Sequence, residues 1–306
     1  MSNLAIPYEL PSVEVEWLKR DVILFALSIG CIIDELQFLY ELHPKFAVFP
    51  TYPTILPFKL TDQEVTEYFS RQSLPSVPGL PKFDPKHGVD GQRTLTIFKP
   101  LPTASTGRSF ELRSRVVAIY DKGKAGTIIE TEQSIVEKNS GEVYSRALGS
   151  AFLIGQGNWG GPKGSVSTQF SPSEGRIPDA RFEIQTSNET AHLYRLNGDY
   201  NPLHAVPDLG QKMGFGGTIL HGMYSWNAVA HGILKQMASS DPQTLREFSA
   251  RFASPVKPGD TLITEIWRMG IGHEGFEDVR FVTKNQKGVP VLSNGRALFR
   301  VQCASL

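Results

Sequence analysis

The stretch FSARFASPVKPGDTLITEIWRM at residues 248–269 predicts a β-strand, a turn marked by two prolines and a glycine, and the start of a second strand. The stretch RTLTIFKPLPTASTGRSFELRSRVVAIY at residues 93–120 follows the same plan, with Phe98-Lys-Pro-Leu-Pro matching Phe252-Ala-Ser-Pro-Val-Lys-Pro. Because the plan occurs once in each half of the chain, it indicates an internal repeat.

Further strands continue each copy of the repeat. Runs that mix β-branched or aromatic residues with polar ones are separated by turn residues such as Pro, Gly and Asn. We expect strands at residues 93–99, 109–120, 125–137, 142–154, 248–253, 260–269, 276–284 and 289–301. The sequence of each half therefore predicts an antiparallel meander.

Helices are expected before the strands of each half. Apolar residues at mixed spacings of three and four predict a helix over residues 13–31, with Gly30 as its stop signal. Two more helices are expected over 187–196, capped by Ser187 or Asn188, and over 222–237. Two copies of a helix followed by antiparallel strands predict an α+β fold in which each sheet wraps a central helix.

Glycine, serine and proline dominate residues 155–178, which we interpret as a linker between an N-terminal domain at 1–154 and a C-terminal domain at 179–306. Gly155-Gln-Gly157-Asn-Trp-Gly160 matches the dinucleotide pattern G-x-G-x-x-G. The pattern needs a helix to bind the pyrophosphate, and Gly161-Pro162 cannot begin one. We therefore predict no nucleotide site here.

The composition excludes several classes of protein. Lysine plus arginine and aspartate plus glutamate number 31 each, which gives no electrostatic footprint for nucleic acid. Cys31 and Cys303 are too few for a disulfide framework, which favours an intracellular protein. The start of the chain has no signal-peptide pattern, and the apolar stretch from Val22 to Ile33 is too short to span a membrane.

The end of the chain weakly resembles a peroxisomal address. Ala304-Ser305-Leu306 ends in leucine, but serine stands where such an address usually has a basic residue. We expect a peroxisomal protein if the address acts, and a cytoplasmic one otherwise.

The densest polar cluster, Tyr194 to His204 (YRLNGDYNPLH), follows a predicted helix. Pro202 ends helical structure, so Asp199, Asn201 and His204 share a tight loop with apolar neighbours. An Asp and a His in such a place can divide the proton transfers of one reaction. When Asp-x-x-x-x-His occurs without further signals, the Asp more often caps a turn and the His is more often a hydrogen-bonded core residue.

A glycine-rich stretch, GFGGTILHG at residues 214–222, directly precedes an apolar helix. A helix N-terminus offers free N–H groups that can bind a developing oxyanion, and glycines let a substrate approach the backbone. A plain glycine loop explains the stretch equally well. A metal site built from His204, His221 and His231 is a weaker alternative, since no metal-ligand spacing supports it.

Tyr194 to His204 resembles the signature Y-x-L-S-G-D-x-N-P-L-H of the hydratase 2, or MaoC-like, family. The resemblance continues through Ile219-Leu-His-Gly222, and it reaches the first half at His87-Gly88, Phe98-Lys-Pro-Leu-Pro and Asp121-Lys122-Gly123. It covers nearly the whole chain, which is similar to the hydratase 2 part of peroxisomal multifunctional enzymes. It departs from the family at Asn197, at Val206 and after His87-Gly88, where Val89-Asp90-Gly91-Gln92 stands in place of the usual Glu-Gln.

The resemblance implies a double hot-dog fold and a (3R)-specific 2-enoyl-CoA hydratase that adds water to trans-2-enoyl-CoA without a metal or other cofactor. It implies Asp199 and His204 as catalytic dyad, Asn201 as orienting residue and the N–H of Gly222 as the oxyanion donor. The substrate-binding residues that the resemblance and the loop indicate are His87, Gly88, Lys122, Tyr200, Pro202, Leu203 and Phe252. The expected partners are an acyl-CoA substrate and a second copy of the chain in a homodimer.

The first half has no matching pair. Its segment Phe25 to Cys31 occupies the place of Tyr194 to Asp199 but carries neither Asp nor His, so we expect one active site with the first half accommodating the acyl chain. Three alternatives remain open: a dehydratase on a polyketide-like or branched acyl thioester, a non-catalytic acyl-thioester-binding module, and a thioesterase on the same fold.

Overall fold

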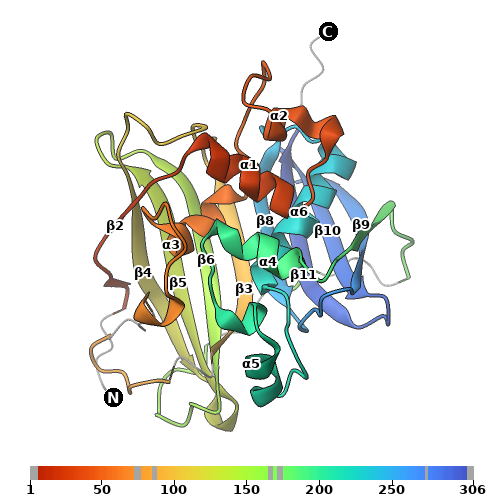
Figure 1. Cartoon of the computed structure of the whole chain (residues 1–306). Coiled ribbons are helices and arrows are strands. Elements are labelled where there is room, and N and C mark those ends of the chain that lie inside the picture. The colour runs from red at the N-terminus through yellow and green to blue at the C-terminus, as the bar shows by residue number, and fades with distance from the viewer. Residues whose placement is uncertain are drawn as a thin grey trace.

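The computed structural model of the chain describes residues 6–71, 77–84, 88–164, 168–170, 175–272 and 275–301. An antiparallel sheet of eleven strands is its largest feature (Figure 1). The strands are β1 (Tyr8–Glu9), β2 (Val13–Val15), β3 (Gly88–Ile97), β4 (Phe110–Asp121), β5 (Gly126–Glu137), β6 (Val143–Ile154), β7 (Ala180–Gln185), β8 (Leu245–Phe252), β9 (Thr261–Ile271), β10 (Phe276–Asn285) and β11 (Pro290–Arg300). The eight predicted strands are confirmed, whereas β1, β2 and β7 were not predicted.

The two halves of the sheet meet at β3 and β8. The strand order is β1-β4-β5-β6-β3-β8-β11-β10-β9-β7, with β2 paired to β4. Across the junction Leu95 faces Phe248 and Thr94 faces Ser249, whose hydroxyl oxygens are 2.8 Å apart. The predicted double hot-dog architecture is confirmed, with its two sheets joined edge to edge because each half leaves one strand edge free to pair. The division into domains at 155–178 stays a prediction.

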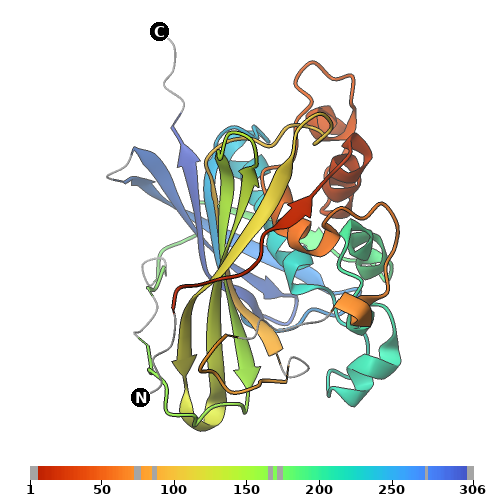
Figure 2. The ribbon, with the colours of Figure 1, turned by 90° about the vertical axis from the view of Figure 1, so that its left-hand side faces the viewer.

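The helices lie on one face of this sheet (Figure 2). They are α1 (Lys19–Ser28), α2 (Leu36–Leu39), α3 (Leu56–Lys59), α4 (Thr190–Tyr194), α5 (Pro207–Lys212) and α6 (Gly222–Ala238). Helix α6, predicted at 222–237, is apolar nearly all round, as expected for a buried helix. Its Trp226 is fully buried, with its ring edge-on to Phe248 of β8 at 4.6 Å. No helix in the described ranges is long and apolar enough to cross a membrane.

Two local predictions about helices were wrong. The helix expected over 13–31 begins only at Lys19, because Val13–Val15 pair with β4 instead. The expected caps Ser187 and Asn188 do not cap α4: Glu189 is its N-cap residue, and the Ser187 hydroxyl accepts the Glu189 N–H at 3.1 Å. The stop signal at Gly30 is confirmed, since α1 ends at Ser28 and Gly30 has a φ of +99°.

The described part of the 155–178 segment is fixed at its start rather than free. The Asp121 carboxylate accepts hydrogen bonds from the backbone N–H groups of Gly123, Asn158 and Gly160 at 2.8–2.9 Å. No helix begins in the described part of this segment, so the glycine pattern at 155–160 is not followed by a helix. Cys303 and the tail Ala304-Ser305-Leu306 lie outside the described residues.

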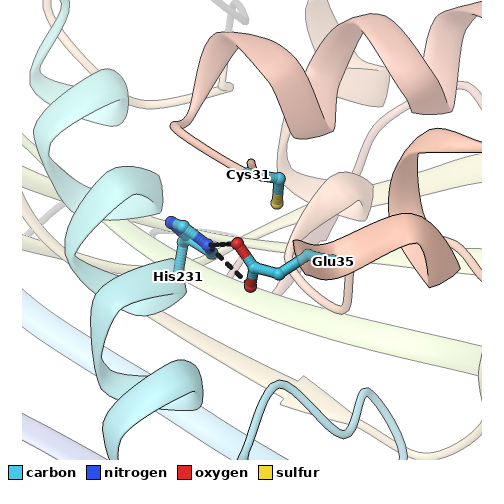
Figure 3. A group of neighbouring side chains, drawn as sticks. All are labelled: Cys31, Glu35 and His231. Carbon is cyan, nitrogen blue, oxygen red and sulfur yellow. Dashed lines mark hydrogen bonds and ion pairs between the residues drawn. The ribbon is translucent and has the colours of Figure 1, made fainter. Parts of the chain in front are cut away.

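A buried ion pair connects the segment after α1 to helix α6 (Figure 3). The Nε2 atom of His231 lies 2.8 and 3.0 Å from the two carboxylate oxygens of Glu35, and the Ser240 hydroxyl donates to one of them at 2.5 Å. Burial opposes ionisation, but these hydrogen bonds outweigh it and lower the pKa of Glu35 to about 2. Beside the pair, burial raises the pKa of the Cys31 thiol, which stays protonated.

We expect Glu35→Gln to lower the free energy of unfolding by about 3–5 kcal/mol at pH 7, because it removes one partner of a buried pair. The folded pKa of Glu35 is depressed from 4.5 to about 2, so its stabilisation is present above pH 4.5 and is lost as the pH falls towards 2. Urea unfolding at a series of pH values should therefore show the difference narrowing below pH 4.5. Glu41→Gln, at an exposed position nearby, is the control. A difference that stays constant with pH would contradict this account.

Candidate active site

A tight loop between α4 and α5 holds the predicted catalytic pair. Gly198 has a φ of +120°, and a Cβ there would lie 2.7 Å from the backbone of α3, so glycine is required. The Asn201 side chain accepts the N–H of Leu203 at 3.0 Å and caps the 3-10 helix Pro202–His204. The loop therefore has little freedom, and it brings Asp199 and His204 to one cavity.

Asp199 is a partly buried carboxylate in the wall of that cavity. Burial raises its pKa to about 6, and the negative charge of Asp90 adds to the rise. The N–H of Asn201 donates a hydrogen bond to Oδ1 of Asp199 at 3.2 Å, and this bond acts in the other direction, to lower the pKa. Near neutral pH the carboxyl can therefore both release and accept a proton, as a general acid–base group must.

His204 is nearly fully buried, with 8% of its surface exposed. Its Nδ1 lies 2.9 Å from the carbonyl oxygen of Ile219. A carbonyl can only accept, so Nδ1 carries the proton and Nε2 keeps its lone pair. Burial lowers the pKa of His204, which favours the neutral ring. The imidazole is thus prepared to accept a proton at Nε2.

His221 belongs to the same cluster, although the sequence suggested it only as a metal ligand. Its ring centroid lies 3.8 Å from that of His204, and its Nε2 lies 3.1 Å from the backbone carbonyl of Asp199. Burial and the neighbouring His204 hold its pKa well below the usual value. Its position directly before Gly222 was the available signal, but its contact with Asp199 depends on the tertiary fold.

The cavity has a volume of about 490 Å³ and is lined mainly by apolar side chains. Asp199, Asn201, His204 and Gly222 all face it. Gly222 begins α6, and the first N–H groups of a helix have no intrahelical partner and carry partial positive charge. The carbonyl oxygen of a ligand in the cavity could therefore accept a hydrogen bond from the Gly222 N–H. The carbon chain of the same ligand would then lie next to Asp199 and His204.

The remaining predicted residues divide into three groups. Gly88, Leu203 and Phe252 line the cavity, and Asp90, which was not predicted, does so too. His87 lies outside the described residues. Three other predicted residues do not belong to the described cavity wall: Lys122, Tyr200 and Pro202. Their contacts with substrate stay predictions. The Lys122 ammonium donates instead to the carbonyl of Lys163 at 2.5 Å.

The weaker metal hypothesis does not survive in its original form. His231 is bound to Glu35 and does not join His204 and His221. Asp199, His204 and His221 do have donor atoms within 4.8 Å of one another, close enough to hold an ion. Each of the two imidazoles bonds a backbone carbonyl through one nitrogen, so each has one nitrogen left for a proton, a water or a ligand.

Known families match both halves of the chain. The MaoC like domain matches residues 169–289, and the MFE-2 hydratase 2 N-terminal domain matches residues 16–155. The chain is 46% identical to the probable dehydratase NIT22 of Ajellomyces capsulatus, over 99% of this chain and 83% of that one. The chain belongs to the MaoC-like hydratase 2 family. This MaoC-like chain is therefore a hydro-lyase, an enzyme that adds or removes water.

Two further relatives of this MaoC-like enzyme agree. Enoyl-CoA hydratase 2, peroxisomal, of Arabidopsis thaliana is 32% identical over 88% of each chain. The crystal structure of a MaoC-like dehydratase from Phytophthora capsici superposes with a TM-score of 0.85 and 30% identity, and covers 99% of both chains. The likeness extends over the helices as well as the sheet, so the whole chain has the family fold.

We expect Asp199→Asn to stabilise this MaoC-like enzyme relative to wild type as the pH rises. The folded pKa of Asp199 is raised from 3.8 to about 6, so its contribution to stability is present below pH 3.8 and is lost as the pH rises through 6. Asparagine carries no charge, so the variant should gain up to about 3 kcal/mol over wild type between pH 4 and pH 7. Urea unfolding measures the gain, with the exposed Asp208→Asn as control. If the difference in unfolding free energy between variant and wild type is the same at pH 4 and pH 7, burial does not raise the pKa of the Asp199 carboxyl.

Proposed function

We propose that the chain is a (3R)-specific 2-enoyl-CoA hydratase, equally a 3-hydroxyacyl-CoA dehydratase in the reverse direction. The observation that carries the proposal is that Asp199, His204 and the N-terminus of α6 at Gly222 line one largely apolar cavity. An acyl chain fits such walls, a thioester oxygen fits a helix N-terminus, and a water fits between a carboxyl and an imidazole.

The reaction follows from the chemistry of these groups. A water held by Asp199 and His204 attacks C3 of the enoyl thioester, with Nε2 of His204 available to accept its proton. The charge that develops on the thioester oxygen is stabilised by the Gly222 N–H. The proton returns at C2 from the same pair of residues. Because both groups act from one side of the substrate, the addition is syn.

The substrate class is supported by relatives and by the cavity. One relative is named an enoyl-CoA hydratase 2, and another a probable dehydratase. The second name supports the alternative function, a dehydratase on a branched or polyketide-like acyl thioester in a biosynthetic pathway. Asp90 also favours it, since this exposed carboxylate in the cavity wall can accept a hydrogen bond from a hydroxyl on the acyl chain.

We extend the proposal to location and assembly. A relative that is named peroxisomal supports a location in peroxisomes. A homodimer is proposed from the resemblance to the family. Substrate contacts are proposed for His87, Gly88, Lys122 and Phe252.

The first test is chiral analysis of the products from crotonyl-CoA and trans-2-decenoyl-CoA. Wild type should form (3R)-3-hydroxyacyl-CoA, and Asp199→Asn and His204→Gln should each lower kcat by roughly 100- to 10,000-fold. Asp208→Asn, on the exposed first turn of α5, should retain full activity. A well-folded wild type that hydrates neither substrate would reject the general hydratase and favour the biosynthetic alternative. Release of free CoA would instead identify a thioesterase.

The oxyanion donor can be tested at a single atom. Gly222→Pro removes the N–H at the first position of α6, where proline suits the helix and His221 already has the extended ψ of 133° that a following proline needs. We expect kcat to fall by roughly 100- to 1000-fold. Gly222→Ala is the matched control, because it keeps the N–H but brings the same Cβ to 3.2 Å from Phe252. Equal losses in the two variants would show that crowding, not the N–H, is responsible.

A further inference from the structure

His221 joins the two parts of the candidate site that the proposed reaction uses separately. Through its backbone it is the residue directly before Gly222 and the N-cap residue of α6. Through its side chain it reaches the carbonyl of Asp199, at a distance of 3.1 Å from Nε2. Its ring also lies against that of His204, with centroids 3.8 Å apart and planes inclined by 31°. His221 thus contacts the backbone of Asp199 and the ring of His204, and it is bonded to Gly222.

The hydrogen bond to Asp199 fixes the tautomer of His221. A carbonyl oxygen only accepts, so Nε2 of His221 carries the hydrogen and Nδ1 is left as a bare acceptor. Within the described part of the chain, this buried Nδ1 has no hydrogen-bond partner. An unsatisfied buried acceptor costs about 1–3 kcal/mol. A phenylalanine at this position would avoid that cost, so packing alone does not account for a histidine.

The surroundings of His221 favour a neutral ring in a fixed orientation. Its side chain is 1% exposed, and Tyr194 packs against it with ring centroids 5.2 Å apart. The charged group that acts on it is Arg195, and His204 is its titratable neighbour. A neutral imidazole held in this way is a rigid spacer with one donor, rather than a group that exchanges protons during turnover.

We propose that His221 is the positioning residue that sets the distance between the Asp199/His204 pair and the Gly222 N–H. This inference rests on the proposed function. Hydration needs the thioester oxygen at Gly222 while C2 and C3 stand at the dyad, and a misplacement of about 1 Å can cost about 100-fold in rate. The side-chain bond to Asp199 and the peptide bond to Gly222 together hold that spacing.

If His221 has this positioning role, a substitution that keeps a hydrogen-bond donor to Asp199 should keep most of the activity, and one that removes the donor should not. His221→Phe keeps a ring against His204 but loses the donor to Asp199, so we expect kcat to fall by roughly 10- to 100-fold, the kinetic equivalent of about 1–3 kcal/mol. KM should change little, because the acyl-CoA contacts lie elsewhere. His221→Gln, whose amide nitrogen can reach as far as Nε2, should recover most of the lost kcat.

His231→Phe is the matched control, because it makes the same substitution on the same helix but breaks the structural pair with Glu35. It should lower the melting temperature and leave the kcat of the folded protein unchanged. Steady-state hydration of crotonyl-CoA by wild type and the three variants, with thermal melts of each, completes the test. Loss in His221→Phe with recovery in His221→Gln supports the role.

Three results would overturn the inference. If wild type is active and His221→Phe keeps its kcat, or if His221→Gln is no better than His221→Phe, His221 is a packing residue and the proposed hydratase stands without it. If wild type itself fails to hydrate, the proposed function is wrong and the inference falls with it.

Discussion

The burial of helix α6 between the sheet and the shorter helices is the constraint on which the rest of the structure depends. Its Trp226 packs on Phe248 next to the junction of the two half-sheets, so the helix and the junction are formed together. Its Asn227, which is fully buried, donates to the hydroxyl of Tyr194 at 3.0 Å and so fixes α4 beside it. The N-terminus of a helix held this firmly gives the proposed oxyanion donor, the Gly222 N–H, a defined position.

The two halves of the molecule differ at the place where the second half has the proposed catalytic residues. Gly30 and Gly198 both have positive φ and both follow helical segments: Gly30 follows α1, and Gly198 follows the 3-10 helix Arg195–Asn197 after α4. The next residue is Cys31 in one half and Asp199 in the other. Near this point the halves touch, where the Asn197 amide donates to the Ser28 hydroxyl at 2.9 Å. The buried Cys31 thiol stays protonated and is neither a base nor a nucleophile. The first half therefore has a buried cysteine at the place where the second half has the proposed catalytic Asp199.

The long strands and α6 could be predicted because each carries its own signal over ten or so residues. The strands β2 and β7 could not, since three to six residues at the edge of a sheet are strands only by virtue of the partner strand. Asp199, His204 and Gly222 were found because turn chemistry and a family motif place them in the sequence. His221 and Asp90 were missed because their place in the cavity comes from contacts between distant segments.

Two carboxyl groups in the interior show how the fold separates structure from chemistry. Glu35 receives hydrogen bonds from His231, Ser240 and the Ile32 N–H, which outweigh the cost of burial, and its pKa falls to about 2. Asp199 receives one long hydrogen bond, at 3.2 Å, and lies near the negative Asp90, and its pKa rises to about 6. A carboxylate supplied with partners is locked in its charged form and can only hold elements together. One that is left short of partners spends part of its time protonated, which is the property that moving a proton requires.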